Sequence, residues 1–339
     1  MKAIKILAVA IGVIFTLLLV GYFSGPKITF EELDPVINHL NIEIHEIEDF
    51  IKEKESSVDG LKEDNHARII WADSTHSRTL YSVVYLHGFS ASQEEGDPLH
   101  EHFAQRYGFN LYLSRLSGHG LKDSSSFESL TPYDMLESAK EAIAFGKLLG
   151  EQVIVMSCST GGTLSAFLAA HNPEMIHSQI MYSPNIDIRD PMSEMLTMPW
   201  GYELAKMSFG GERNIISYTP QRRQYWNDSY HINGLIAVKG LIEATMTEET
   251  FGKITQPLFL GYYYKDEDNQ DEIVSVARMK EYYQQVSTED ALKVEMAFPD
   301  AGRHVITSYM SSEDVEGVMN ATFDFADRVL NLKPVVTVD

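Results

Sequence analysis

Cysteine is almost absent from this chain: its 339 residues include a single one, Cys158. One cysteine excludes an internal disulfide and a cysteine-rich metal site. Positive charge is also scarce, because 27 lysine and arginine residues stand against 49 acidic ones and the formal net charge is −22. Nucleic acid and anionic membrane surfaces repel an acidic protein, so we expect neither as a partner.

Charge is missing altogether from residues 6–23, which follow Lys2 and Lys5. A helix of this length is about enough to cross a bilayer core of ~30 Å. No clear cleavage site follows the run, which favours an uncleaved anchor over a cleaved signal sequence. We therefore expect residues 1–25 to be a transmembrane anchor, with secretion after signal cleavage as the alternative. The preceding lysines place the rest of the chain outside the cytoplasm, in the periplasm or at the cell surface.

Apolar residues recur at helical spacing from Asp34 to about Lys54, and acidic residues occupy the positions between them. The apolar stripe consists of Val36, Leu40, Ile44, Ile47 and Ile51. We expect residues 26–60 to form an acidic amphipathic helical linker whose stripe packs against the domain that follows.

From residue 68 onward, short apolar runs alternate with helix-compatible segments. The expected strands are 68–72, 81–86, 111–113, 153–156, 179–183, 257–263 and 293–298. The expected helices are 98–107, 130–149, 164–170, 276–285 and 312–330, and Thr131-Pro132 is a typical helix start. This alternation predicts a mainly parallel central sheet with helices on both faces.

The alternation stops over residues 186–246, which contain many methionine and aromatic residues and no clear strand. A helical insertion of this composition suits a cap over an apolar pocket, although simple packing onto the domain is an alternative. We therefore assign residues 61–185 and 247–339 to the core domain and 186–246 to the cap. The residues we expect to line a substrate pocket are Trp200, Tyr202, Met207 and Trp226.

The segment Ser157-Cys158-Ser159-Thr160-Gly161 joins an apolar strand to a helix. It matches the G-x-S-x-G pattern, in which a serine is exposed on a strained strand-to-helix turn, except that Ser157 replaces the first glycine. Ser159 is therefore a candidate nucleophile. Cys158 is the alternative, although the turn geometry favours the serine.

A nucleophilic serine needs a base and an acid that orients the base. Asp271 and His304 each follow a predicted strand, where open α/β sheets place their functional side chains. The order Ser159, Asp271, His304 is the serine–acid–histidine order of the α/β-hydrolase fold. Asp266 and Asp268 lie in the same long acidic loop and compete with Asp271 for the role of the acid.

Five motifs in this order resemble the α/β-hydrolases of the monoacylglycerol lipase, carboxylesterase and serine aminopeptidase group. The motifs are an oxyanion turn, a Gly-His-Gly loop, the serine turn, a D-x-x-V acid motif and a G-x-H base motif, at 87–89, 118–120, 157–161, 271–274 and 302–304. The resemblance covers residues 81–330. It implies an α/β-hydrolase fold with a cap, catalysis by Ser159, Asp271 and His304, and an oxyanion hole built from the N–H groups of Phe89 and Thr160.

We therefore expect a membrane-anchored serine hydrolase that cleaves lipid-like or aromatic carboxylic esters without a cofactor. Its expected partners are a small-molecule ester substrate and the membrane that holds the N-terminal helix. A peptidase or amidase using the same residues, and a non-catalytic scaffold used for binding, remain alternatives. No metal site is expected, because His100 and His102 lie two residues apart on a predicted helix and do not share a face.

Overall fold

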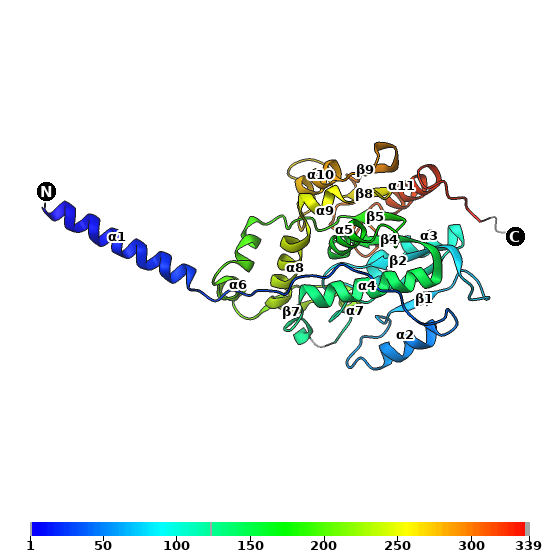
Figure 1. Cartoon of the computed structure of the whole chain (residues 1–339), viewed down its shortest axis with the longest axis horizontal. Coiled ribbons are helices and arrows are strands. Elements are labelled where there is room, and N and C mark those ends of the chain that lie inside the picture. The colour runs from blue at the N-terminus through cyan, green and yellow to red at the C-terminus, as the bar shows by residue number, and fades with distance from the viewer. Residues whose placement is uncertain (1, 123, 336–339) are drawn as a thin grey trace.

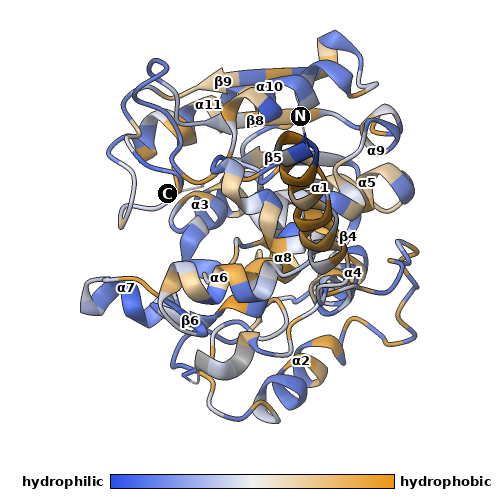
Figure 2. Cartoon of the chain, turned by 90° about the vertical axis from the view of Figure 1, so that its left-hand side faces the viewer, coloured by the Kyte–Doolittle hydropathy of each residue, from blue (hydrophilic) through white to orange (hydrophobic). Residues whose placement is uncertain are grey.

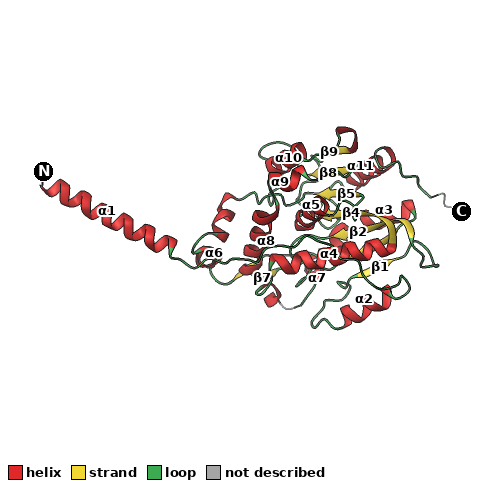
Figure 3. Ribbon diagram, in the orientation of Figure 1, coloured by secondary structure: helices red, strands yellow, loops and turns green. Residues whose placement is uncertain are grey.

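A seven-stranded sheet forms the centre of the protein in the computed structural model, which describes residues 2–122 and 124–335 (Figure 3). The strand order is β1-β3-β2-β4-β5-β8-β9, and every neighbouring pair is parallel except β1 with β3. The strands are β1 (Arg68–Ile70), β2 (Thr79–Leu86), β3 (Asn110–Leu113), β4 (Gly150–Cys158), β5 (Ser178–Tyr182), β8 (Leu258–Tyr262) and β9 (Lys293–Ala297). The expected mainly parallel sheet is thereby confirmed.

Helices cover both faces of this sheet (Figure 1). One face carries α3 (Leu99–Tyr107) and α11 (Val315–Arg328), and the other carries α4 (Pro132–Leu149), α5 (Thr160–His171), α9 (Glu248–Gly252) and α10 (Val276–Gln285). Three short 3-10 segments complete the core domain: η1 (Gln93–Gly96), η2 (Ser124–Phe127) and η4 (Asp290–Leu292). Helix α4 starts as expected, because the Thr131 hydroxyl accepts from the Asp134 N–H while the Asp134 carboxylate accepts from the Thr131 N–H.

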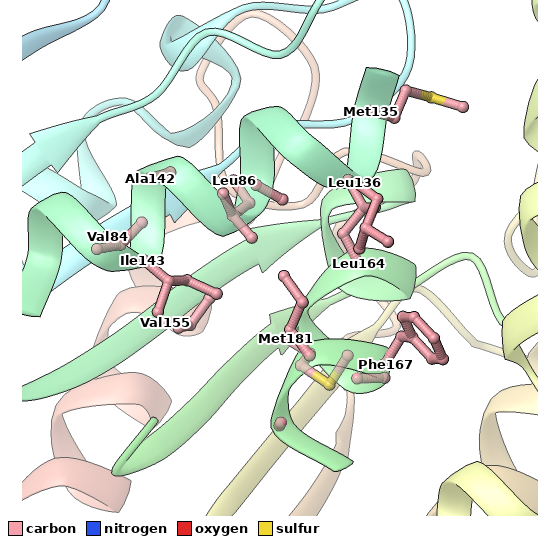
Figure 4. Packing of buried hydrophobic residues seen from close by; sticks show 14 of the residues in the cluster. Val84, Leu86, Met135, Leu136, Ala142, Ile143, Val155, Leu164, Phe167 and Met181 are labelled. Carbon is pink, nitrogen blue, oxygen red and sulfur yellow. The ribbon is translucent and has the colours of Figure 1, made fainter. Parts of the chain in front are cut away.

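The core between the sheet and helices α4 and α5 is built from buried aliphatic, methionine and aromatic side chains (Figure 4). Leu86, Val155 and Met181 project from three adjacent parallel strands and are fully buried. Burying each such side chain contributes about 1.5–3 kcal/mol. The central strands are buried on both sides, which explains their continuous rather than alternating apolar runs.

The expected linker helix forms only over its last third, as α2 (Ile47–Ser56). Residues 26–43 have no regular secondary structure and run over the cap and core to α2 (Figure 1). Side chains of the domain bind this backbone directly: the Asn172 amide donates to the Pro35 carbonyl at 2.8 Å and its oxygen accepts from the Ile37 N–H at 3.0 Å. The Lys140 ammonium binds the Asp34 carbonyl at 3.1 Å. These contacts stabilise an extended strap where the periodicity alone predicted a helix.

The N-terminal helix α1 (Lys2–Phe23) projects away from the body of the protein (Figure 1). Figure 2 shows that it is hydrophobic along nearly its whole length. Its segment Ile4–Phe23 is long and apolar enough to cross a membrane, and none of it is buried within the protein. A membrane span and a signal sequence both fit these properties.

The cap contains a small two-stranded sheet that the sequence did not reveal, in addition to its helices. Strands β6 (Arg213–Ile215) and β7 (Ser229–His231) pair in antiparallel fashion. The helical parts are η3 (Pro191–Thr197), α6 (Gly201–Phe209), α7 (Pro220–Tyr225) and α8 (Ile232–Thr245). The entirely helical cap expected from the composition is therefore corrected to a mixed one.

Helix α5 and strand β2 come so close at Gly161 that no side chain fits between them. A Cβ atom at this position would overlap the backbone carbonyl of Leu86. The contact is between two backbones, so neither partner can rotate away. Gly161 thus fixes the start of α5 against the central strands.

We expect Gly161→Ala to lower the free energy of unfolding by about 2 kcal/mol or more, since forced overpacking typically costs about 1–3 kcal/mol. Gly252→Ala is the matched control, because a Cβ at Gly252 meets nothing within 4 Å. Urea unfolding in detergent, followed by tryptophan fluorescence, measures both. Equal stability of the two variants would contradict the close approach.

Candidate active site

Ser159 lies at the turn between β4 and α5 with a backbone that L-residues rarely adopt, φ 52° and ψ −119°. Backbone hydrogen bonds hold this turn: the Ser159 N–H donates to the Tyr182 carbonyl at 3.2 Å, and the Ser159 carbonyl accepts from Asn185 and Gly162. The side chain lines a cavity of about 460 Å³. A serine in such a strained turn has the geometry expected of a nucleophile.

Cys158 is poorly suited to be the nucleophile. Its side chain is fully buried among the apolar residues beneath α3 and α11. Burial, together with the negative charges of Glu95 and Asp271, raises the pKa of the thiol well above its ordinary value. Because the thiolate is the reactive form, these surroundings leave the cysteine inert.

His304 and Asp271 are joined by a hydrogen bond of 2.7 Å between Nδ1 and Oδ2. Asp271 is fully buried, and its other oxygen accepts from the N–H groups of Ile273 and Val274 at 2.9 and 3.0 Å. Burial alone would raise the pKa of Asp271, but the charge and hydrogen bond of His304 and these two N–H groups lower it. The aspartate is therefore an anion that fixes the orientation of the imidazole ring.

The length of the acidic loop does not displace Asp271. The Asp271 N–H donates to the Tyr263 carbonyl at 3.1 Å, so the chain returns to the end of β8 after residues 264–270. Asp266 lies within this excursion, where its carboxylate accepts from the N–H groups of Asp268 and Asn269. Asp266 and Asp268 are exposed and neither contacts His304, so the structure brings only Asp271 of the three to the histidine.

The turn after β2 lies directly beside Ser159. A Cβ at Gly88 would lie 2.9 Å from the Ser159 Cβ, so only glycine fits there. The buried His87 ring braces the turn, with Nδ1 2.9 Å from the Gly88 carbonyl and Nε2 accepting from Leu116. Phe89 and Thr160, whose N–H groups we expected to bind an oxyanion, line the same cavity as Ser159. Thr160 is the first residue of α5, where N–H groups have no acceptor within the helix.

Glu95 is a buried carboxylate in the same cavity that was not expected from the sequence. One oxygen accepts from the Gly88 N–H at 2.6 Å. Burial raises the pKa of Glu95, and its charge in turn helps to raise the pKa of His304. No motif marks this residue, since it reaches the site from a 3-10 segment one turn beyond the His-Gly-Phe turn.

Of the four cap residues expected to line the pocket, Trp226 does so and the other three do not. Trp200 and Met207 are exposed, at 40 % and 79 %. The Trp200 indole N–H donates to the carbonyl of Gly21 at 3.0 Å, which places this side of the cap beside the end of α1. Tyr202 stacks on His231. The expected pocket is thus corrected: cap residues that line the cavity include Ile216, Tyr218, Arg222, Tyr230, Leu235 and Val238.

Within the described parts of the chain, one group of side chains has the spacing of a metal site: Asp97, His100 and Glu101, with ligand atoms within 4.8 Å of one another. Its histidine is His100, whose Nε2 lies 2.9 Å from the Gln93 carbonyl. His102 does not join the group, since its ring contacts the Met319 sulfur. Burial raises the pKa of Asp97 and that of Glu101, and the positive charge of Arg68 opposes this shift at both carboxyls.

Comparison with known proteins agrees with this geometry. Residues 78–307, more than half of the chain, match the family model described as "Serine aminopeptidase, S33". A thermostable monoacylglycerol lipase of Bacillus sp. (strain H-257) is 33 % identical over 93 residues, which are 27 % of this chain and 36 % of the lipase. The match therefore spans about a third of that relative's length.

Two solved structures have the same fold. One, described with the metagenome-derived lipolytic enzymes LipS and LipT, superimposes with a TM-score of 0.61 at 17 % identity, over 78 % of this chain and 98 % of the other. The second is the monoacylglycerol lipase of Paleococcus ferrophilus, with a TM-score of 0.55 at 17 % identity, over 77 % and 97 % of the two chains. The α/β-hydrolase fold expected from the sequence is thereby confirmed.

We expect the His304 ring to titrate above the ordinary histidine value of about 6.5. Burial opposes protonation of His304, but the charge and hydrogen bond of Asp271 and the charge of Glu95 outweigh it and raise the pKa. Asp271→Asn should lower the pKa strongly and Glu95→Gln should lower it less. NMR of protein labelled at histidine Cε1, with the His304 signal assigned by its loss in His304→Gln, measures the pKa in each variant.

Asp266→Asn is the matched control, because its carboxylate lies in the exposed part of the same loop. Its His304 signal should titrate as in the wild type. A shift as large as that of Asp271→Asn would reassign the acid to Asp266.

Proposed function

The chain belongs to the serine aminopeptidase S33 family of α/β-hydrolases, and from this premise we propose that it is a serine hydrolase that cleaves carboxylic esters through Ser159, His304 and Asp271. One observation carries the proposal. His304 lines the same cavity as a serine held at positive φ, and its Nδ1 is hydrogen-bonded at 2.7 Å to the buried carboxylate of Asp271. This is the set of groups that acyl transfer requires.

In the proposed reaction, the Ser159 hydroxyl attacks the ester carbonyl while its proton passes to the free Nε2 of His304. Asp271 stabilises the imidazolium that forms, through the hydrogen bond at Nδ1. The N–H groups of Phe89 and Thr160 donate to the oxyanion of the tetrahedral intermediate. The imidazolium then gives its proton to the leaving alcohol. A water molecule activated by the neutral ring hydrolyses the acyl-enzyme.

The cavity supports an ester with a sizeable apolar part. Its lining includes Phe89, Ile188, Leu235, Val238 and Ile273, and each CH₂ buried there contributes about 0.8 kcal/mol. The likeness to a monoacylglycerol lipase and to lipolytic enzymes points the same way. We infer a lipid-like or aromatic ester. A peptidase with the same residues is the second candidate, favoured by the description of the family.

We propose that α1 remains as a membrane anchor and that the hydrolase domain lies outside the cytoplasm. The helix is fully exposed, and the preceding lysines fit a cytoplasmic N-terminus. Exposed Met198 and Trp200 lie beside its end, with the Tyr22 hydroxyl 3.6 Å from the Met198 sulfur. Aromatic residues at the end of a membrane-spanning helix, such as Tyr22 and Trp200 here, suit the membrane interface.

Ser159→Ala should lower kcat on p-nitrophenyl esters by about a thousandfold or more, because loss of the nucleophile removes covalent catalysis. Cys158→Ala is the control and should stay within about threefold of the wild type. Activity is measured on esters of increasing acyl length beside aminoacyl anilides. Mass spectrometry should locate a fluorophosphonate label on Ser159. Labelling at another serine would contradict the assignment, and faster cleavage of anilides than of esters would favour the peptidase.

The native protein should retain residues 1–25 and sediment with membranes, and deletion of these residues should move it to the supernatant. The reason is that transfer of about 20 apolar residues into the bilayer makes insertion effectively irreversible. N-terminal sequencing and membrane fractionation test both statements. A native N-terminus near Gly25 would identify a cleaved signal instead.

A further inference from the structure

The cap helix α7 places a positive charge in the cavity that holds Ser159 and His304. Arg222 on this helix lines the cavity, and its charge acts on the His304 ring, where it opposes protonation. The Arg222 charge is therefore close enough to affect the pKa of His304, the proposed base. The mechanism above gives it no role.

In the part of the chain that the structure describes, the Arg222 guanidinium has aromatic neighbours but no hydrogen-bond acceptor. It lies over the rings of Tyr218 and Trp226, at 4.7 and 5.1 Å from their centroids. Its Nε is buried without a hydrogen-bond partner, and within residues 2–122 and 124–335 no carboxylate oxygen lies within 4.0 Å of its side chain. Stacking on aromatic faces leaves the N–H edge of a guanidinium free to bind.

The neighbouring arginine on the same helix is placed differently. Arg223, the next residue of the same helix, is half exposed and lies 3.8 Å from the Asp228 carboxylate. The chain has 49 acidic against 27 basic residues, so anionic partners are abundant. The buried Nε–H of Arg222 has no hydrogen-bond partner, which is unfavourable, and a ligand anion would remove that cost.

The other charged groups around the cavity leave room for an anion near Arg222. The Glu95 carboxylate accepts from the Gly88 N–H on the Ser159 side, Glu272 is exposed, and Arg303 is a second, exposed cation. A single fork of N–H donors matches the two oxygens of a carboxylate, whereas a dianionic phosphate usually needs several cations.

We propose that Arg222 binds a carboxylate of the substrate, so that the preferred esters carry an anionic group as well as the scissile bond. The proposal rests on the ester hydrolase function proposed above. It narrows the substrate class from apolar esters to half-esters of dicarboxylic acids and to similar molecules with one free carboxylate. The aromatic and aliphatic lining would then hold the segment between the carboxylate and the ester.

The test compares p-nitrophenyl hemisuccinate, hemiglutarate and hemiadipate with the neutral butyrate, valerate and hexanoate of the same chain lengths. In the wild type, kcat/KM should favour at least one anionic ester over its neutral match by about tenfold or more. Arg222→Gln should lower that ratio by a similar factor. Arg222→Lys keeps the charge but not the forked N–H donors, so its ratio should lie between those of the wild type and Arg222→Gln. Arg223→Gln should leave the ratio and the neutral activity unchanged.

Competition gives a readout that does not depend on turnover of an anionic ester. Free adipate should inhibit butyrate hydrolysis competitively, and Arg222→Gln should raise its inhibition constant about tenfold. Inhibition by inorganic phosphate that is stronger than that by adipate and depends on Arg222 would overturn the carboxylate assignment. Rapid hydrolysis of neutral esters, with a ratio that Arg222→Gln and Arg222→Lys leave unchanged, would overturn the proposal and leave the esterase intact. If neither the wild type nor any variant cleaves an ester, the proposed hydrolase function is overturned, and this assignment with it.

Discussion

The strained turn at Ser159 is the constraint on which the rest of the site depends. Its positive φ allows β4 to end and α5 to begin within one residue, with the side chain facing the cavity. The turn is possible only because Gly161 and Gly88 lack side chains where the backbones of α5 and β2 and the serine itself meet. Parallel neighbours on both sides of β4 then deliver their loops to the same edge of the sheet. The cost of the strained backbone is met by the packing of the central strands.

Electrostatically, the His304 ring feels two carboxylates of different character. Asp271 is an anion stabilised by backbone N–H groups, whereas burial raises the pKa of Glu95. Arg222 adds one cation on the cap side. The charge of the chain as a whole says little about this balance, since −22 describes mainly a solvated surface.

The sequence predicted the features that depend on local chemistry. Alternating apolar runs gave the sheet and its helices, and short motifs gave the positions of Ser159, Asp271 and His304, which the structure gathers around one cavity or in one hydrogen-bonded pair. It did not predict the strap at residues 26–43, because a helical spacing of apolar residues also fits an extended segment held by Asn172. The roles of Glu95 and Arg222 could not be predicted for a related reason. Their roles depend on the groups that they contact in the folded protein, and those groups are distant in the sequence.

The hydrogen bond between the Asp271 N–H and the Tyr263 carbonyl has a consequence for how this loop can vary. This bond holds the two ends of residues 264–270 together. A second bond, from the Lys265 N–H to the Asn269 carbonyl, joins the two sides of the loop nearer its tip. The segment is a side branch from the path between β8 and the aspartate. Residues can therefore be added or removed at its tip without changing the reach of the carboxylate to His304. The number of residues between β8 and the aspartate therefore does not indicate which acidic residue of such a loop reaches the histidine. The tip of the loop can accept new residues, in evolution or by design, that make new contacts.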